Sequence, residues 1–259
     1  MRVPKRLVDR RREELRGLIQ RNGFLPVPEI CRRLAISEAT ARRDLAAMEG
    51  NGHIARTYGG ALADYNSAFA SLDERSGRAR LAKARIAAKA AAEIPRSGTI
   101  FLDAGTTIQA LAKALTGRRD LTHLVVATNS LAAASVLSGS AGIELHVVGG
   151  MFLSRQAALM GARAIRAIGA WTFEAAFLSA ARMDASGLSN SHESIAEFQK
   201  AVLRRSARKY FCLDASKLGR STPHRVARWN QMTALITDAT PKRLAAHAIN
   251  LRPARILQA

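Results

Sequence analysis

The 259-residue sequence has only two cysteines, few aromatic residues and half as many acidic as basic side chains. Cys31 and Cys212 fall in segments that we predict below to be separate domains, so a disulfide framework is not expected. The six histidines show no ligand spacing with each other or with the cysteines. We therefore predict neither a metal site nor a cofactor.

Long apolar stretches are also missing. The sequence contains no run of 18 apolar residues, which is about the length needed to cross a bilayer. Its arginine-rich N-terminus lacks the apolar segment of a signal peptide. We therefore expect a cytoplasmic protein without a membrane partner. The shortage of acidic residues leaves a net charge of +20, which favours anionic partners such as nucleic acids. Because the positive excess is spread over the whole chain, it does not locate a nucleic-acid site.

Residues 27–61 have the pattern of a helix-turn-helix with a small hairpin behind it. A short helix is predicted over 28–34, a tight turn over 35–37, a second helix over 38–49 and a hairpin over 52–60. This order of elements, with positive charge on the second helix, is typical of proteins that place a helix in the DNA major groove.

The second helix of this pattern has distinct inward and outward faces. Ala41, Leu45 and Met48 recur at the spacing of one helix face, and Ile30 on the preceding helix can meet them. Ser37 is placed to cap the helix by accepting a hydrogen bond from its free N–H groups. The helix is therefore predicted to be fixed on a core with its other face turned outward.

The outward face carries the candidate DNA contacts. Arginine can bond two acceptors of guanine, and threonine can touch the methyl group of thymine. We predict base contacts for Thr40 and Arg43 and phosphate contacts for Arg42 and Arg56. The full predicted DNA-binding set is Ser37, Ala39, Thr40, Arg42, Arg43 and Arg56. The alternative is a charged helix face that is only solvated.

This segment resembles the winged helix-turn-helix of the DeoR family of bacterial regulators. The resemblance is carried by residues 37–45 and by the positions Gly52, Ile54, Arg56 and 59–61. Ala41 stands where the family usually carries isoleucine. If nothing refills the space, the missing methylene groups weaken the packing by about 1–3 kcal/mol.

The rest of the chain reads as a second, larger domain. No helix or strand periodicity is evident between residues 63 and 80. The predicted division is therefore a DNA-binding domain over 1–62, a linker over 63–80 and an effector-sensing domain over 81–259. Short β-rich runs then alternate with helical stretches, which predicts an α/β domain with a mostly parallel sheet and helices on both faces. Strands are expected at 100–102, 123–127, 144–148, 175–179, 210–213 and 234–237, and helices at 81–92, 106–115, 131–137, 162–168 and 193–208.

Ligands of such sheets bind at the carboxyl ends of the strands, so the residues that follow each strand are candidates. After the first strand, a glycine, two hydroxyl groups and a helix N-terminus offer a cradle suited to phosphate. A lysine after a later strand would add a point charge for the same group. The candidates are Asp103, Gly105, Thr106, Thr107, Asn129, Gly149, Gly150 and Lys217. Taken singly, each could be an ordinary turn or surface residue.

The second domain also resembles the DeoR family, whose sensor domain looks like ribose-5-phosphate isomerase and glucosamine-6-phosphate deaminase. The matching positions are 103–107, 128–130, 149–150, Gly161, Gly187, Glu197, 214–217, Lys83 and Ile86. The resemblance spans roughly residues 6–240 and implies that a phosphorylated sugar or polyol is the effector, with Glu197 in its site. Gln199 stands where the family usually carries lysine, which removes a positive charge near the predicted pocket.

Two functions fit these observations. The first is a transcriptional regulator, expected to repress a carbohydrate-metabolism operon and to be controlled by the effector. The second is a sugar-phosphate isomerase or deaminase-like enzyme, for which Asp103, Asp184, Asp214 and Glu197 could supply a base. The dedicated recognition helix favours the regulator. A homo-oligomer, dimer or tetramer, is expected because one such domain reads only a few base pairs of double-stranded operator DNA.

Overall fold

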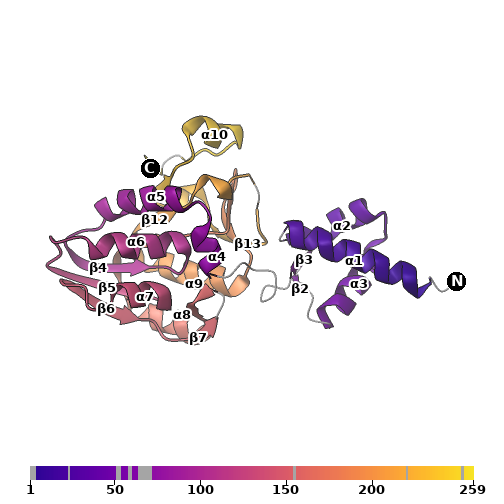
Figure 1. The fold of residues 1–259 in the computed structure, drawn as a ribbon, viewed down its shortest axis with the longest axis horizontal. Coiled ribbons are helices and arrows are strands. Elements are labelled where there is room, and N and C mark those ends of the chain that lie inside the picture. Colours follow the sequence, from indigo (N-terminus) through magenta and orange to yellow (C-terminus); the bar gives the residue numbers. More distant parts are fainter. Residues whose placement is uncertain are drawn as a thin grey trace. The chain divides into compact units, whose positions relative to one another are not determined.

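The computed structural model shows two compact units, Met1–Ala70 and Ser71–Ala259, whose elements are labelled in Figure 1. The structure describes residues 4–22, 24–50, 54–57, 60–63, 72–153, 156–219, 221–251 and 254–259. No helix in these ranges is both long enough and apolar enough to cross a bilayer.

The N-terminal unit packs three helices with a small antiparallel sheet of strand order β1-β3-β2. Its elements are α1 (Lys5–Asn22), β1 (Phe24–Pro26), α2 (Val27–Leu34), α3 (Glu38–Gly50), β2 (Ile54–Thr57) and β3 (Gly60–Ala63). The predicted winged helix-turn-helix is thus confirmed. β1 is an added strand that the sequence did not predict. It has only three residues, and its proline is tolerated because the strand lies at the edge of the sheet.

The core of this unit contains the helix face predicted from the sequence. Ala41, Leu45 and Met48 are buried and lie in one cluster with Ile30. The same cluster takes in Leu15, Ile19, Leu25, Val27 and Ile54. The second helix is therefore held from its inner face, as expected.

A buried carboxylate also ties α1 to α3. Asp44 on α3 is 2% exposed, and its two oxygens accept hydrogen bonds from Arg11 Nε at 2.6 Å and Arg12 Nε at 2.9 Å. Charged pairs of this kind are strong when one partner is shielded from water. Asp44, Arg11 and Arg12 were not predicted to form this clamp.

The larger unit is built on a sheet of seven strands, in the order β15-β14-β12-β9-β4-β5-β6. All neighbouring strands in it are parallel. Its strands are β4 (Ser97–Leu102), β5 (His123–Thr128), β6 (Ile143–Val147), β9 (Phe173–Leu178), β12 (Ser206–Cys212), β14 (Ala234–Thr237) and β15 (Arg255–Gln258). The six predicted strands are all present, and β15 is an additional edge strand.

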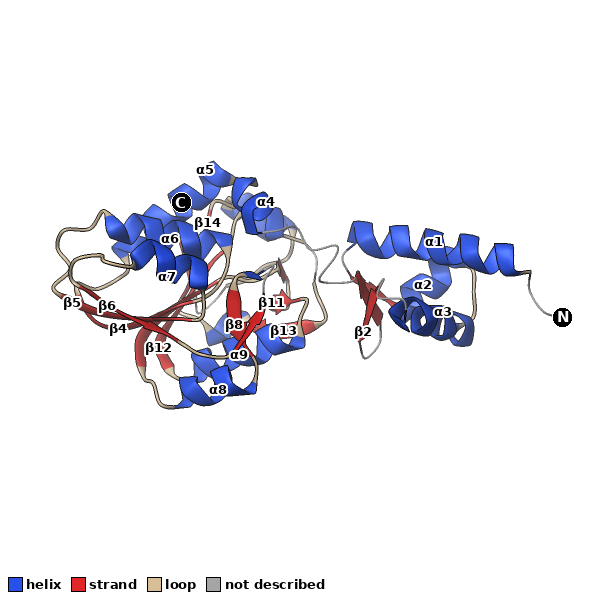
Figure 2. Ribbon diagram, turned by 60° about the horizontal axis from the view of Figure 1, so that its bottom comes forward, coloured by secondary structure: helices blue, strands red, loops and turns tan. Residues whose placement is uncertain are grey.

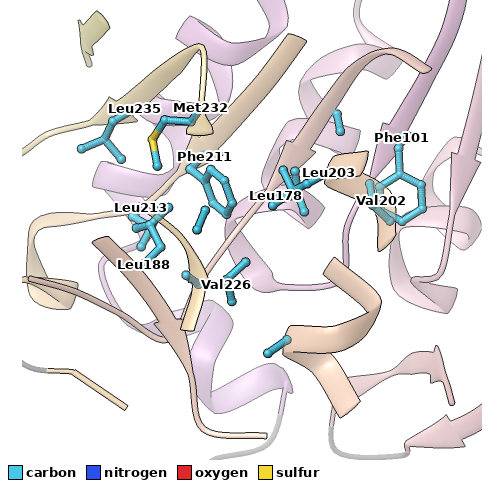
Figure 3. Close-up of a cluster of buried hydrophobic side chains, with 14 of the residues drawn as sticks. Phe101, Leu178, Leu188, Val202, Leu203, Phe211, Leu213, Val226, Met232 and Leu235 are labelled. Atoms are coloured by element: carbon cyan, nitrogen blue, oxygen red, sulfur yellow. The ribbon is translucent and has the colours of Figure 1, made fainter. Parts of the chain in front are cut away.

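Helices cover both faces of this sheet, as the alternating pattern predicted (Figure 2). Successive side chains of a strand point to opposite faces, so Ile100 and Leu102 pack in one apolar cluster and Phe101 in the other. The first cluster is closed by α5 (Arg80–Ala92), α6 (Thr106–Thr116) and α7 (Leu131–Leu137). The second is closed by α8 (Ala162–Gly169) and α9 (Glu193–Arg204). Figure 3 shows part of it, including Phe101 of β4 and Val202 of α9.

The remaining elements are short. They are α4 (Leu72–Gly77), β7 (Met151–Leu153), β8 (Ala158–Met160), β10 (Arg182–Asp184), β11 (Gly187–Asn190), β13 (His224–Ala227), α10 (Pro241–Ala246) and the 3₁₀ turns η2 (Ala215–Lys217) and η3 (Trp229–Gln231). β10, β11 and β13 form a separate antiparallel sheet, and β7 pairs with β8. α4 lies inside the segment predicted to be a linker, whose residues 64–71 fall outside the described chain.

One predicted helix boundary is wrong. The helix expected over 193–208 ends at Arg204, and β12 begins at Ser206. The carbonyl of Arg205 accepts a hydrogen bond from the N–H of Phe173, and Ser206 is then in register with Phe173 on β9. Pairing with a distant strand has therefore overridden the helical pattern of the local sequence.

Candidate functional site

The outward end of α3 forms the first candidate site. Ser37 Oγ accepts a hydrogen bond from the N–H of Thr40 at 3.3 Å, so the predicted cap is present. The same hydroxyl lies 3.0 Å from Thr40 Oγ1. Ala39, Arg42 and Arg43 are exposed, whereas Thr40 is half-buried. The structure thus gathers five of the six predicted DNA-binding residues at one helix end.

The two arginines of this surface have different surroundings. Arg42 pairs with Glu38 at 2.5 Å, and both side chains are more than half exposed. Arg43 has no hydrogen bond or ion pair to any residue that the structure describes. Because exposed pairs contribute little, Arg42 can exchange Glu38 for a phosphate at small cost. The side chain of Arg56, the sixth predicted residue, lies outside the described residues.

The second candidate site lies at the carboxyl ends of the central strands of the seven-stranded sheet. Asp103 follows β4, Asn129 follows β5, Ser179 follows β9 and Asp214 follows β12, and these strands are neighbours. Leu102 is in register with Thr128 and with Phe177, which brings the residues after them to one edge. The rule that ligands bind where parallel strands end therefore applies to the side chains predicted from the sequence.

Asp103 is the centre of a buried polar network. Its side chain is 1% exposed, and Oδ2 accepts hydrogen bonds from Gln199 Nε2 at 2.5 Å and from Ser179 N–H at 3.4 Å. Gln199 also donates to the carbonyl of Ser179 at 2.7 Å and accepts from Asn190 Nδ2 at 2.6 Å. Gln199, which stands where the family resemblance implies a lysine, thus contacts Asp103 directly.

The environment of Asp103 changes its acidity. Burial raises its pKa from 3.8 to about 6, although hydrogen bonds from Gln199 and the backbone of Ala104 and Ser179 work in the opposite direction. Perturbed buried carboxyl groups of this kind are concentrated at functional sites.

The predicted phosphate cradle sits beside this network. Gly105 is the N-cap residue before α6 and has a φ of +139°, a conformation that other residues rarely adopt, and its N-cap makes no side-chain hydrogen bond to the helix. Thr107 is buried, and Thr106 lines a cavity of about 540 Å³ between α4, α5 and α6. The free N–H groups of the first helical turn can bind an anion.

Cationic side chains gather near the end of β12. Lys217 is half-buried, and burial lowers its pKa, against the opposing effect of Asp214. Lys83 on α5 is buried; Nζ donates to the carbonyl of Arg75, and to that of Arg78 at 2.6 Å. Burial lowers the pKa of Lys83 as well, with Asp214 again acting in the opposite direction and Lys217 reinforcing the shift. A negatively charged ligand would relieve this crowding of positive charge.

Three predicted effector residues have a different setting. Glu197 is exposed on α9 and pairs with Lys200 at 2.8 Å, and its predicted place in the effector site stays a prediction. The helix instead turns the neighbouring Gln199 inward. Gly150 serves close packing, since a Cβ there would come within 2.6 Å of the carbonyl oxygen of Met160. Gly149 is exposed and has open space around its Cα.

Four buried side-chain atoms have no hydrogen-bond partner among the described residues: Asp103 Oδ1, Asn129 Oδ1, Gln156 Nε2 and Ser191 Oγ. A buried polar atom without a partner costs about 1–3 kcal/mol. Asp103 and Asn129 follow paired strand positions, and Ser191 adjoins Asn190 of the polar network. Unsatisfied atoms grouped in this way are suited to a ligand.

Sequence reasoning missed Ser179, Asn190 and the role of Gln199. Ser179 could have been found, because it follows β9 just as Asp103 follows β4. Asn190 lies on a short antiparallel strand, and its contact with Gln199 has no local signature in the sequence.

The comparisons with solved structures give weak likenesses. Ribose-5-phosphate isomerase from Methanocaldococcus jannaschii matches with 18% identity and a TM-score of 0.39 over 53% of each chain. Translation initiation factor eIF-2B from Pyrococcus horikoshii matches with 14% identity and a TM-score of 0.45, over 90% of this chain and 82% of that chain.

The sequence comparisons are more informative. The lactose phosphotransferase system repressor of Streptococcus mutans is 33% identical, over 89% of this chain and 92% of that protein. The transcriptional repressor GlcR of Bacillus subtilis is 30% identical, over 86% and 85%. The glycerol-3-phosphate regulon repressor of Escherichia coli is 28% identical, over 86% and 88%.

A winged helix-turn-helix followed by an α/β domain with candidate ligand-binding residues at its strand ends is the architecture of a DNA-binding transcriptional regulator. Family models identify which one: the DeoR-like helix-turn-helix domain matches residues 11–66, and the DeoR C-terminal sensor domain matches residues 78–239. The chain belongs to the DeoR family, and the three relatives above are named as repressors.

Proposed function

We propose that this protein represses carbohydrate-metabolism genes and that a phosphorylated sugar or polyol controls its binding to operator DNA. The observation that carries the proposal is the end of α3, where exposed Arg42 and Arg43 stand on a helix fixed by a buried core and by Asp44. The names of the relatives, which refer to lactose, glycerol-3-phosphate and repression, support the same class of target.

The effector site of this proposal has two parts. The first turn of α6 and the lysine cluster, Lys83 and Lys217, are suited to the phosphate group. The network around Asp103 is suited to the rest of the ligand. A ligand controls DNA binding only if it binds the DNA-competent and the incompetent state with different affinity, and repression that the ligand relieves is the expected sign.

An enzyme is the alternative, and the surroundings of the candidate carboxylates do not favour it. Asp214 accepts a hydrogen bond from the N–H of Ser216, and Asp184 from that of Ser186. Glu197 is on the surface, so Asp103 is left without a second carboxylate partner among the described residues. We therefore propose a regulator without catalytic activity, which acts in the cytoplasm where its DNA is.

The DNA-binding part is tested by comparing two arginine variants. Fluorescence anisotropy should be measured with a duplex selected for binding and with a random duplex. Arg43→Ala should lower the affinity for the selected duplex by about 10- to 100-fold, because a good bidentate base contact is worth about 1–3 kcal/mol. It should also reduce the preference for the selected over the random duplex. Arg42→Ala should lower the affinity for both duplexes by the same factor. An Arg43→Ala protein with unchanged affinity and preference would contradict the proposed orientation of α3.

The effector part is tested on the complex with the selected duplex. Phosphorylated sugars and polyols should release the wild-type protein from this DNA and leave a Lys217→Ala variant bound. A steady turnover of any of these compounds, abolished in Asp103→Asn, would support the enzyme instead.

A further inference from the structure

Gln199 is oriented by a chain of hydrogen bonds that starts at the main chain. The N–H of Ala181 donates to Asn190 Oδ1 at 2.9 Å, so the other end of that amide, Nδ2, must face Gln199 Oε1. Gln199 Nε2 therefore points to Asp103 and to the carbonyl of Ser179. Both of its hydrogens are used, and Gln199 has no donor or positive charge left for a ligand.

This arrangement leaves two buried acceptors at one edge of the sheet, on the residues that follow the paired positions Leu102 and Thr128. Gln199 and Ser179 engage Asp103 Oδ2 only, and Oδ1 has no partner among the described residues. On the next strand, Asn129 Nδ2 faces the carbonyl of Leu159 at 3.3 Å, so its unpartnered Oδ1 points elsewhere. Each of these acceptors can accept the O–H of one ligand hydroxyl group, and both repel the oxygens of a carboxylate or phosphate.

Positive charge is concentrated in another part of the site. The groups that influence the acidity of Asp103 are Gln199 and the backbone of Ala104 and Ser179, none of which is charged. Lys83 and Lys217 instead share the influence of Asp214. The edge of the sheet thus has a cationic part and a part that is lined by acceptors, in which no cation acts on Asp103.

We propose that Gln199 is a specificity-determining residue, which positions Asp103 so that the acceptor-lined part of the site binds a hydroxyl group of the effector and rejects a carboxylate. The inference rests on the proposed function and narrows its ligand to phosphorylated compounds with an uncharged, hydroxylated end.

Matched ligand pairs test this proposal on the full-length protein. Glycerol 3-phosphate and 3-phosphoglycerate differ in one end group, CH₂OH against carboxylate, as do ribitol 5-phosphate and 5-phosphoribonate, and sorbitol 6-phosphate and 6-phosphogluconate. Calorimetry at pH 7.5 should give the polyol member of the best-bound pair a Kd at least tenfold lower than that of its acid.

Three variants separate positioning from mere folding. Gln199→Lys should reduce this preference at least tenfold, mainly by improving the binding of the acid. Gln199→Met keeps the size of the side chain but removes its hydrogen bonds, and should weaken the polyol more than the acid. Gln258→Lys adds the same charge on exposed β15 and should leave the ratio unchanged.

The outcomes distinguish the two levels of the proposal. If a phosphorylated ligand binds but the acid is preferred, or if Gln199→Lys and Gln199→Met both keep the wild-type ratio, the role of Gln199 is wrong and the proposed function stands. If no member of any pair binds, the proposed effector class is wrong, and this inference is wrong with it.

Discussion

At the scale of single residues, Asp103 shows that the candidate pocket is maintained at the expense of stability. One of its oxygens is held by Gln199, while the other is buried without a partner among the described residues. Burial of an ionised carboxylate that no cation compensates is unfavourable, and the raised pKa expresses this. Residues that weaken a fold in this way are characteristic of binding sites.

The effect of Asp103 on stability depends on pH. The pKa in the folded protein, about 6, exceeds the ordinary value of 3.8, so the native state retains its proton to higher pH than the unfolded chain. The contribution of Asp103 to the free energy of unfolding is therefore most favourable below pH 4, falls as the pH rises to 6, and stays lower above it. By linkage, the difference is on the order of 2–3 kcal/mol.

Asp103→Asn should remove this dependence. We expect the variant to have a higher Tm than the wild type at pH 7.5 and the same Tm near pH 4, as measured by scanning calorimetry. Asp120→Asn is the control, because the pKa of exposed Asp120 is lowered to about 2 by Arg118 and its loss should not raise the Tm. An Asp103→Asn protein that melts below the wild type at pH 7.5 would contradict this account of the site.

At the scale of elements, the position of α3 depends on its attachment to α1 as well as on its apolar face. Asp44 is shielded from solvent, whereas Arg11 and Arg12 are 20% and 31% exposed. Glu38 on the same helix pairs with Arg42 in full contact with water. The two carboxylates should therefore differ strongly in their contribution to stability.

This difference can be measured in the full-length protein. Asp44→Asn should lower the free energy of local unfolding of α1 and α3 by about 2 kcal/mol, since hydrogen bonds to charged groups contribute about 1.5–3 kcal/mol. Glu38→Gln should change it by less than about 0.5 kcal/mol. Hydrogen exchange of the amides in α1 and α3 gives both values, and equal effects of the two substitutions would disprove the clamp.

The elements also show what sequence alone can predict. The six central strands were predictable because each is a short apolar run next to a helical pattern. β15 is four residues long and mostly exposed, so no apolar run marks it in the sequence. β10 and β11 are equally short, and they are buried by contacts with distant parts of the chain that no local pattern indicates. The strand-end rule found Asp103, Asn129 and Lys217, but Gln199 and Asn190 reach the site from α9 and β11 through non-local contacts.

At the scale of the whole molecule, the net charge of +20 dominates encounters with DNA. Binding that neutralises phosphates weakens steeply as salt rises. If two copies each contribute Arg42 and Arg56, about four phosphates are neutralised, and affinity for a random duplex should fall on the order of 100-fold between 50 and 200 mM salt. Anisotropy titrations at the two concentrations measure this, and a salt-independent affinity would contradict phosphate contact.

The predicted homo-oligomer is tested by molar mass. One chain has a mass of 27.9 kDa. Light scattering coupled to gel filtration should give two or four times this mass at micromolar concentration. A monomer that still binds an operator tightly would contradict the argument that one DNA-binding domain reads too few base pairs.

The hydrogen bonds that Lys83 makes to the end of α4 indicate where the DNA-binding domain can be exchanged. The ammonium group binds the carbonyls of Arg75 and Arg78, and so fastens the first described helix of the sensor unit to α5 from within. All the residues proposed above to bind the effector lie C-terminal to α4. Recombination upstream of Leu72 could therefore graft a different DNA reader onto the same sensor, so that one metabolite signal comes to govern new genes.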